Sequence, residues 1–217
     1  MSEGLELTAA RGFVEPRLQA EFPGIGLAWM TVERGRRSSP RALRQRLRAL
    51  SNRIHGASVV TMRTQPIPHA YRSFYRQIGV DPDASRIPSE EAAVMRLLQG
   101  GFESRGLLSD ALLIALLETG VPVWALEADR VGPGGLGIRT TVEGDRFGSV
   151  QQPLAAERLV VADAERVHAL LFGAVAPGHG VEARTQRIAL FAVGVAGVPA
   201  IHVEEALWTC GDILVSV

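Results

Sequence analysis

The sequence predicts an α+β fold, in which a single domain contains a mixed β-sheet flanked by helices. Three observations support this prediction. The middle of the chain carries three successive helical patterns, each with its own start and end signals. After Gly120 the pattern changes to short β-branched runs separated by Gly, Pro and Asp turns. No long linker, low-complexity segment or fixed-period repeat interrupts the chain. We therefore expect residues 1–60 to form an amino-terminal strand and an Arg-rich helix that are an integral part of one compact domain with a core at residues 61–217.

The first elements are expected to be a strand and a basic amphipathic helix. Residues 22–33 (FPGIGLAWMTVE) combine a turn with a β-rich run. Ser39 followed by Pro40 then predicts a helix start, with Ser39 as the N-cap. The apolar stripe of this helix recurs at helical spacing, at Leu43, Leu47, Leu50 and Ile54. Arginines on its other faces are Arg41, Arg44 and Arg48.

The segment from Arg34 to Arg53 is the one charge asymmetry in the chain, because it holds eight arginines and no acid. Two interpretations stay open. The arginines are either a solvated helix face beside an acidic neighbour or a patch that faces RNA phosphates.

The middle of the chain predicts three helices. Pro68 precedes the first, at residues 69–78, whose aromatic stripe is expected to be core. Ser89 is expected to cap the second, with Glu90 in its first turn and a Gly pair at 100–101 after its end. Ser109 is expected to cap the third, at residues 110–119, which ends at Gly120.

The second half of the chain predicts a sheet and one final helix. The β-branched runs that predict strands are residues 121–126, 138–142, 159–162, 168–176 and 188–195. Pro199 then predicts the start of a helix at residues 200–210.

Composition limits the functions that need to be considered. The formal net charge is zero, so any attraction to nucleic acid must be local. All 23 basic residues are Arg, which indicates either a coding bias or a preference for phosphate. Cys210 is the only cysteine, which excludes an internal disulfide and a thiolate zinc cluster and fits a reducing cytoplasm. Residues 1–12 do not have the pattern of a signal peptide, and no apolar run approaches the roughly 20 residues that span a bilayer. We expect a cytoplasmic protein that binds neither membrane nor DNA.

The chain carries no motif for a cofactor, a metal or a covalent nucleophile. Residues 132–137 (GPGGLG) match G-x-G-x-x-G, but a strand follows them where a dinucleotide site needs a helix, so we expect a hairpin-like loop. His202 and Glu205 are spaced to share a helix face, yet no third ligand lies near them in sequence. We therefore expect no cofactor and no metal.

Several segments, in order, resemble the B3/B4 family, the aminoacyl-tRNA editing module of the beta subunit of phenylalanyl-tRNA synthetase. The first is residues 71–101, where an aromatic and Arg-containing helix is followed by RIPSEE and a helix that ends in Gly. The others are residues 107–131 (LLSDALLIALLETGVPVWALEADRV), 138–147, 158–175 and 181–207. The resemblance spans about residues 66–207, and with the run near Phe22 the chain looks like the compact free-standing form of this family.

The resemblance implies a fold similar to the editing domain, recognition of a tRNA acceptor end, and hydrolysis of a wrongly attached amino acid by water. Three positions depart from the family pattern. Trp124 stands where the editing module has a His, Leu113 where the family usually has Asn, and Pro177 about where the pocket Glu would fall. His179 follows Pro177 closely and is our candidate for a replacement base, with an exposed loop histidine as the alternative.

The resemblance yields a set of candidate site residues. The expected catalytic residues are His179 and Asp110. The expected substrate-binding residues are Ser89, Glu90, Thr185 and Trp124. The expected RNA-binding residues are Arg41, Arg44, Arg48 and Arg72. Each also has a purely structural interpretation: helix caps and first-turn acids, a strand-end threonine, aromatic bulk and surface arginines.

Two functions follow from these expectations. The first is a trans-editing hydrolase that deacylates mischarged aminoacyl-tRNA. The second is a diverged non-catalytic module that binds RNA or an amino-acid-like ligand. A third interpretation, an interaction scaffold without RNA, would be favoured if the rest of the fold covered the face of residues 34–53. A polar, accessible pocket containing His179 would favour the hydrolase, and a pocket filled by Trp124 would favour the binding module.

Overall fold

The computed structural model describes residues 8–149 and 153–216 and has the α+β architecture that the sequence predicts. Its helices are α1 (Pro16–Glu21), α2 (Arg41–Arg53), α3 (Gly56–Met62), α4 (Pro66–Gln77), α5 (Pro88–Gln99), α6 (Leu107–Thr119) and α7 (Ala200–Val215), with a 3-10 turn η1 (Ala128–Arg130). Its strands are β1 (Ala10–Arg11), β2 (Phe13–Val14), β3 (Gly26–Glu33), β4 (Val123–Glu127), β5 (Gly137–Thr140), β6 (Leu159–Ala162), β7 (Val167–Leu170) and β8 (Arg187–Gly194).

The strands form two sheets where the sequence had predicted one. The first sheet has the order β1-β3-β8-β4 and is antiparallel throughout. In the second sheet, β2-β5-β6-β7, the β2–β5 pair is parallel and the other pairs are antiparallel. The single-sheet prediction was wrong because period-2 patterns identify strands but not their partners.

Strand β8 is the centre of the core. It pairs with β3 along its whole length, from Gly26 opposite Gly194 to Glu33 opposite Arg187, and with β4 on its other side. Every residue from Ile188 to Gly194 is buried, as expected for a continuous apolar run that is covered on both faces.

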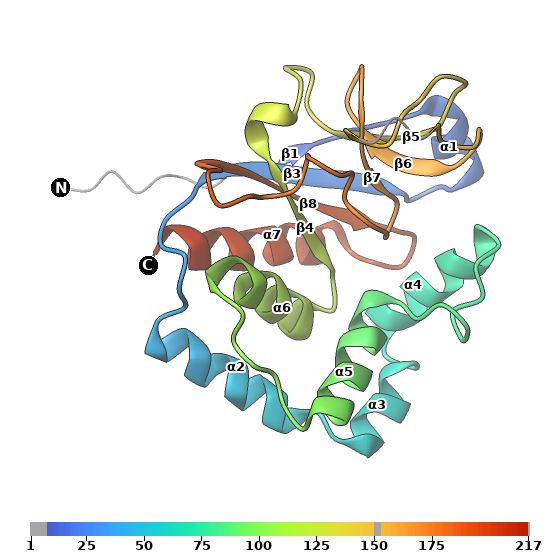
Figure 1. Ribbon diagram of the computed structural model, residues 1–217. Coiled ribbons are helices and arrows are strands. Elements are labelled where there is room, and N and C mark those ends of the chain that lie inside the picture. Colours follow the sequence, from blue (N-terminus) through green and yellow to red (C-terminus); the bar gives the residue numbers. More distant parts are fainter. Residues whose placement is uncertain (1–7, 150–152, 217) are drawn as a thin grey trace.

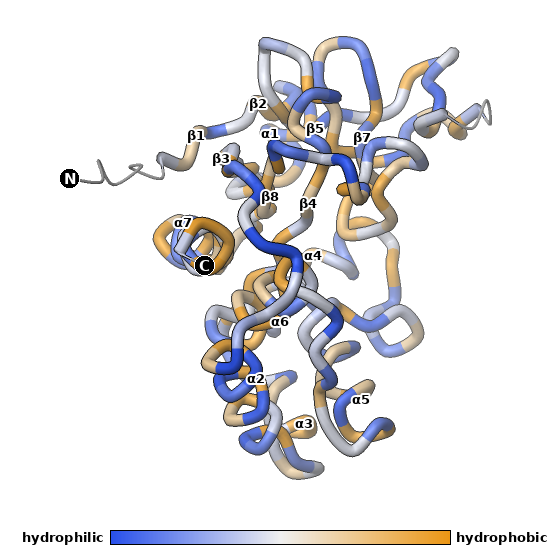
Figure 2. Tube along the Cα trace, turned by 60° about the vertical axis from the view of Figure 1, so that its left-hand side comes forward, coloured by the Kyte–Doolittle hydropathy of each residue, from blue (hydrophilic) through white to orange (hydrophobic). Residues whose placement is uncertain are grey.

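The elements lie in layers (Figure 1). The two sheets form the upper part of the molecule, and α7 and α6 lie directly below the first sheet. Helices α2, α3 and α5 lie at the bottom of this view, and α4 leads from them toward the sheets, where the hydroxyl of Tyr71 donates to the carbonyl of Val193 in β8. The tube in Figure 2 shows this arrangement from the side, with long hydrophilic stretches on α2 and the segment that leads into it. Residues from before position 60 also belong to the main hydrophobic core, among them Leu18, Leu27 and Leu47.

The helix ends agree with the sequence at their carboxyl sides and differ at their amino sides. Gly100 and Gly120 both adopt the left-handed conformation that ends α5 and α6, as expected. The three serine caps were wrong. Pro40, Ile87 and Gly106 occupy the N-cap positions of α2, α5 and α6, and none of these helices has a side-chain cap.

Of these three serines, Ser39 makes a hydrogen bond elsewhere in the fold. Ser39 donates a hydrogen bond of 2.6 Å to the carboxylate of Asp110, which lies in the first turn of α6. The amino end of α2 is thus linked to the amino end of α6. The final helix is also longer than predicted and continues to Val215. In the described part of the chain, no helix is both long enough and apolar enough to cross a membrane.

Candidate active site

The second sheet carries a chain of three buried polar side chains. Asp163 follows β6, His168 lies in β7, and His179 lies in the loop after β7. Nε2 of His168 lies 2.9 Å from Oδ2 of Asp163, and Nδ1 of His168 lies 2.9 Å from Nδ1 of His179. His168 is completely buried, and His179 is only 8% exposed. His179 is among the site residues that the sequence predicts, whereas Asp163 and His168 are not.

The carboxylate of Asp163 determines which nitrogens of His168 and His179 carry protons. Oδ1 of Asp163 accepts from the backbone N–H of Glu165 and Arg166, and Oδ2 accepts from the backbone N–H of Gly132. A carboxylate with three N–H donors is held in its ionised form, so the fourth partner, Nε2 of His168, must also donate. Nδ1 of His168 is then an acceptor.

The same logic assigns His179. Because Nδ1 of His168 accepts, Nδ1 of His179 must carry its proton and donate it. The remaining nitrogen, Nε2 of His179, carries a lone pair and has no hydrogen-bond partner among the described residues. The series of hydrogen bonds from Asp163 through His168 therefore ends at Nε2 of His179, which is free to accept a proton.

Burial and the contacts among the three side chains shift the pKa values of Asp163, His168 and His179. Burial alone would raise the pKa of Asp163, but the donation by His168 and the backbone N–H groups lowers it to about 2. Burial lowers the pKa of His168, and Asp163 opposes that shift. Burial, followed by the charge interaction with His168, lowers the pKa of His179 to about 4. At neutral pH, His179 is uncharged and able to accept a proton.

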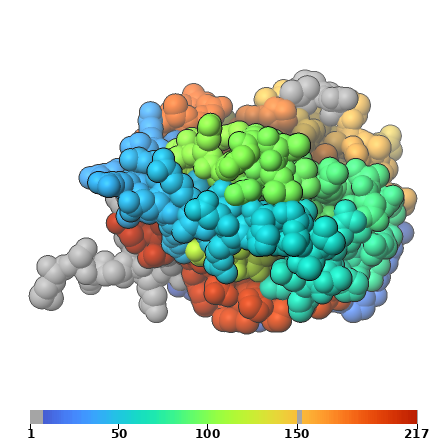
Figure 3. Space-filling view, turned by 90° about the horizontal axis from the view of Figure 1, so that it is seen from below, coloured from blue at the N-terminus to red at the C-terminus, as the bar shows by residue number. Residues whose placement is uncertain are grey.

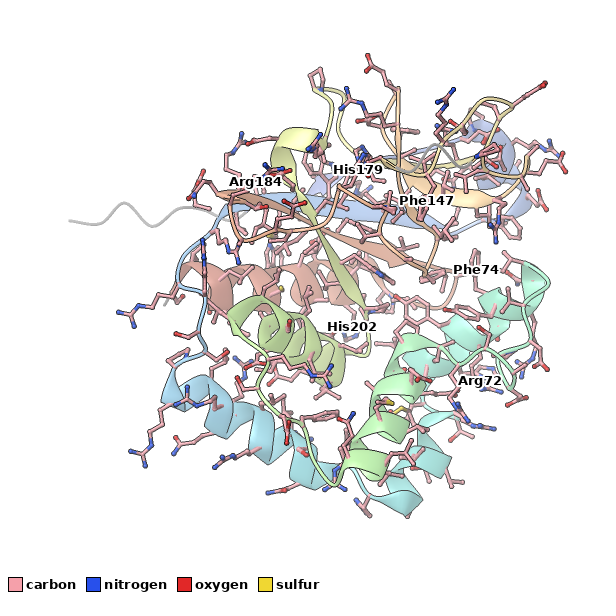
Figure 4. The ribbon with its side chains drawn as sticks, in the orientation of Figure 1. Arg72, Phe74, Phe147, His179, Arg184 and His202 are labelled. Atoms are coloured by element: carbon pink, nitrogen blue, oxygen red, sulfur yellow. The ribbon has the colours of Figure 1, made fainter. Side chains whose placement is uncertain are left out.

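His179 lines a hollow of about 260 Å³ at the surface of the second sheet. The other residues around it are Gly144, Asp145, Arg146, Gly148, Glu165, Arg166 and Val167. Gly148 is required there, because its φ is +64° and a Cβ would collide with the carbonyl oxygen of Pro177. Figure 4 shows His179 in the sheet half of the molecule, beside Phe147 and far from Arg72.

Backbone hydrogen bonds fix the loop that carries His179. The N–H of His179 donates to the carbonyl of Ala176, and the N–H of Ala176 donates to the carbonyl of His168. On its other side, the carbonyl of His179 accepts from the N–H of Glu127. The histidine is therefore held in place by both neighbouring strands, and the alternative of an exposed loop histidine was wrong.

Asp110 does not join this site. Its carboxylate accepts from the hydroxyls of Ser39 and Ser104 and from the backbone N–H of Arg105, all at the start of α6. These bonds bridge α2, the loop before α6 and α6 itself. The expected grouping of Asp110 with His179 was wrong because the donors around Asp110 all come from the helical half of the molecule.

Ser89, Glu90 and Arg72 also lie in the helical half. Both oxygens of the Glu90 carboxylate lie 2.9 Å from Nη1 of Arg72, and both side chains are almost fully buried. Nη2 of Arg72 pairs with Asp83 at 2.7 Å. Arg72 is only 5% exposed, so the expectation of an exposed arginine was wrong at this position. Ser89 lines a different cavity from the one that contains His179.

Thr185 is nearer to the histidine chain than the other expected residues. Its hydroxyl lies 3.3 Å from the carboxylate of Glu127, whose backbone N–H binds the carbonyl of His179. Thr185 also accepts from the backbone N–H of Glu182. These two contacts organise the loop between His179 and β8.

Trp124 packs within a group of aromatic side chains. Its ring stacks on Phe191 with a centroid distance of 5.6 Å and an angle of 12°, and it also contacts Phe172. Tyr71, Phe74 and Tyr75 of α4 surround Phe172 from the other side. The residue expected to contact substrate is therefore part of the packing between β4, β8 and α4.

The arginines of α2 are exposed. Arg41, Arg44 and Arg48 all face solvent, and no other described element covers them. This face is therefore open, contrary to the condition that would have favoured an interaction scaffold. Arg34 and Arg37, just before α2, donate hydrogen bonds to carbonyls of the 182–185 loop.

The remaining sequence candidates have structural roles. Residues 132–137 form a turn that leads into β5. His202 and Glu205 form a pair at 3.3 Å on α7, and within residues 8–149 and 153–216 no three His, Cys, Asp or Glu side chains form a potential metal site. Cys210 is fully buried in α7, where burial raises the pKa of its thiol.

Compared with models of known protein families and with curated proteins, the sequence matches none.

Proposed function

We propose that this protein is a free-standing hydrolase that removes an amino acid from the 3′ end of a mischarged tRNA, with His179 as the general base. The observation that carries the proposal is the chain from Asp163 through His168 to His179, which ends in a nitrogen without a partner at a surface hollow. A buried histidine with this backing is the arrangement expected of a base that activates water.

The chemical step would use one water and no covalent intermediate. Nε2 of His179 takes a proton from water as the water oxygen attacks the ester carbonyl. The tetrahedral intermediate then collapses, the bond to the ribose oxygen breaks, and His179 returns its proton to that oxygen. The products are the free amino acid and the tRNA with its hydroxyl restored. Asp163 stabilises the positive charge that forms on the two imidazoles.

Two arginines of the hollow supply positive charge for the negatively charged intermediate. Arg146 and Arg166 both line the hollow with His179. Arg146 is exposed and has no carboxylate partner in the described part of the chain. A guanidinium at this place would stabilise the oxyanion of the intermediate.

The arginine segment supports RNA as the substrate. Arg34 and Arg37 bind the loop that begins directly after His179, and the segment continues into the exposed arginines of α2. The segment therefore carries arginines from the loop next to the candidate site into α2. The resemblance of five segments to the B3/B4 family supports an aminoacyl ester as the reacting group.

The test is deacylation of correctly and incorrectly charged tRNAs by the wild type and by His179→Asn. Asn keeps a donor near the position of Nδ1 and therefore the bond to His168, but it has no basic nitrogen. We expect the variant to lose a factor of about 10² to 10⁴ in rate. His69→Asn, at an exposed histidine of α4, is the matched control and should keep the wild-type rate. A wild type that releases no amino acid from any charged tRNA would refute the proposal.

A second candidate is a non-catalytic module that binds RNA. The stacking of Trp124 on Phe191 favours it, because an aromatic group occupies the position where the family has a polar residue. This candidate predicts tRNA binding that weakens with salt, together with no release of amino acid by either the wild type or the variant.

A further inference from the structure

A second hollow lies in the helical half and shares no residue with the His179 site. It has a volume of about 540 Å³, within the range of small-molecule sites. Its apolar walls come from α2, α3, α4 and α6 and include Leu50, Ile54, Met62, Ile67, Leu116 and Leu117. In Figure 3 the yellow-green end of α6 is visible between the cyan of α2 and α3 and the red of α7.

Ser89 is an unusual wall residue, because its hydroxyl is buried and has no hydrogen-bond partner. The residue is only 6% exposed. A buried hydroxyl without a partner costs about 1–3 kcal/mol, and such groups in native proteins commonly have a partner that the isolated chain lacks. Ser89 lies in the first turn of α5, where the helix dipole favours an acceptor with negative charge.

The charges around the cavity select the ligand. Glu118 is neutralised outside the cavity by a two-pronged pair with Arg46, at 2.9 and 2.5 Å. Arg53 has no carboxylate partner in the described part of the chain. His202 also contributes a buried Nδ1 that makes no hydrogen bond, although the Glu205 carboxylate lies 3.3 Å away. The cavity therefore has one uncompensated positive charge beside apolar walls.

We propose that this cavity binds a small carboxylic acid with an apolar body, with its carboxylate between Arg53 and Ser89. A single carboxylate matches the single free guanidinium of Arg53, whereas a doubly charged phosphate would carry a second negative charge for which the hollow has no further free cation among the described residues. The apolar body would cover the leucine and isoleucine walls.

Helix α3 gives the ligand a way in. It supplies Ser58 and Met62 to the cavity wall, yet none of its residues is buried. Displacing so short and exposed a helix costs little packing energy, so entry does not require the core to open.

The experiment is isothermal titration of the full chain with octanoate, 3-phenylpropanoate and, as the neutral comparison, octan-1-ol. We expect saturable one-site binding of at least one acid, at least tenfold tighter than the alcohol. The absence of saturable binding by both acids, or equal binding of acid and alcohol, would overturn the proposal.

Variants locate the site. Ser89→Ala and Arg53→Gln should each weaken binding of the acid at least fivefold, and Arg53→Gln should also abolish the preference over the alcohol. Ser89→Ala should fold with unchanged or slightly higher stability, because it removes an unsatisfied hydroxyl. Arg184→Gln, at an exposed arginine on the sheet side (Figure 4), is the matched charge control.

The result is independent of the proposed hydrolase. His179→Asn, which tests catalysis, should bind the acid as the wild type does, since His179 is not part of this cavity. Unchanged binding in both Ser89→Ala and Arg53→Gln would place the acid elsewhere and refute the assignment.

Discussion

The helical half and the sheet half of this molecule each bury a carboxylate, and they stabilise it in different ways. In the helical half, Glu90 pairs with the permanently charged guanidinium of Arg72. In the sheet half, Asp163 is held by backbone N–H groups and by His168, which passes its contact on to His179.

The two buried carboxylates differ in whether their partners can take part in proton transfer. In the helical half the guanidinium of Arg72 and the carboxylate of Glu90 are buried and bonded to each other, so the pair acts as a fixed link between α4 and α5. The imidazole of His179 can gain and lose a proton, and burial lowers its pKa to about 4, so it is an uncharged acceptor at neutral pH. Only the second arrangement ends in a free acceptor at a hollow, and this comparison directs the proposal of activity to His179.

The largest expected change in the free energy of unfolding comes from breaking the Arg72–Glu90 pair. Glu90→Ala should lower the free energy of unfolding by about 3 kcal/mol, because it leaves the guanidinium of Arg72 buried with only the exposed Asp83 as a close partner. Urea unfolding followed by circular dichroism measures the change. The matched control is Glu91→Ala, at an exposed acid in the same turn of α5, which should stay within about 0.5 kcal/mol of the wild type. Similar losses of stability for the two variants would mean that the buried Glu90 contributes no more than the exposed Glu91.

A smaller loss of stability is expected when the pH is lowered, because His179 in the sheet half is held in its neutral form. The pKa of His179 is about 4 in the folded protein, against 6.5 in the unfolded chain. The unfolded state therefore binds a proton that the folded state does not, and stability is complete above pH 6.5 and falls as the pH is lowered toward 4. The loss should reach at most about 3 kcal/mol.

Urea unfolding at several pH values between 7.5 and 4.5 measures this loss. The stability of His179→Asn should change less with pH over that range than the stability of the wild type, whereas His69→Asn should follow the wild type. If the curves of wild type and His179→Asn stay parallel, the histidine is not held in its neutral form.

The same pKa predicts the pH dependence of catalysis. A base with a pKa of about 4 is available throughout the neutral range, so deacylation should be nearly constant between about pH 5.5 and 8. A histidine with an ordinary pKa of 6.5 would lose most of its rate at pH 5.5. A rate that falls with a midpoint near pH 6.5 would show that the chain behind His179 does not shift it.

The smallest effect is expected at the third buried carboxylate. Asp110 is held by two hydroxyls and one N–H, all neutral donors. Asp110→Asn keeps one acceptor oxygen for the N–H of Arg105, and its NH2 group replaces Oδ2, so the two hydroxyls must turn from donors into acceptors. We expect a loss of about 1–2 kcal/mol, measured by the same unfolding experiment. Ser39→Ala should cost a similar amount, and the double variant should cost less than the sum, because the two residues share one hydrogen bond. Strict additivity would contradict the contact.

Much of the fold could be predicted because it depends on local patterns. The apolar run at residues 188–195 identified the central strand, and Gly100 and Gly120 identified helix ends, since each signal acts within a few residues. Two of the three serine caps failed where a proline neighbours the serine and fixes the backbone, Pro40 after Ser39 and Pro88 before Ser89. Ser39 also satisfies a distant carboxylate in place of its own helix.

The candidate site could be predicted only in part. The four residues between Asp163 and His168 join two predicted strands, and a hairpin of that length places the two side chains together, so this contact had a signal in the sequence. The contact of His168 with His179 had none, because it depends on how the next loop returns across β7. The family resemblance groups the remaining expected residues in one site, but they lie in different layers of the structure.

The burial of Cys210 has a practical consequence for labelling. The only thiol of the chain lies fully enclosed in α7, with its pKa raised, so reagents in solution will modify it only when α7 separates from the sheet. The rate of its modification is therefore a measure of how often the core opens. A cysteine introduced at Ser58 would react much faster, so a fluorophore could be attached beside the carboxylic acid cavity in the folded protein without removing the native thiol.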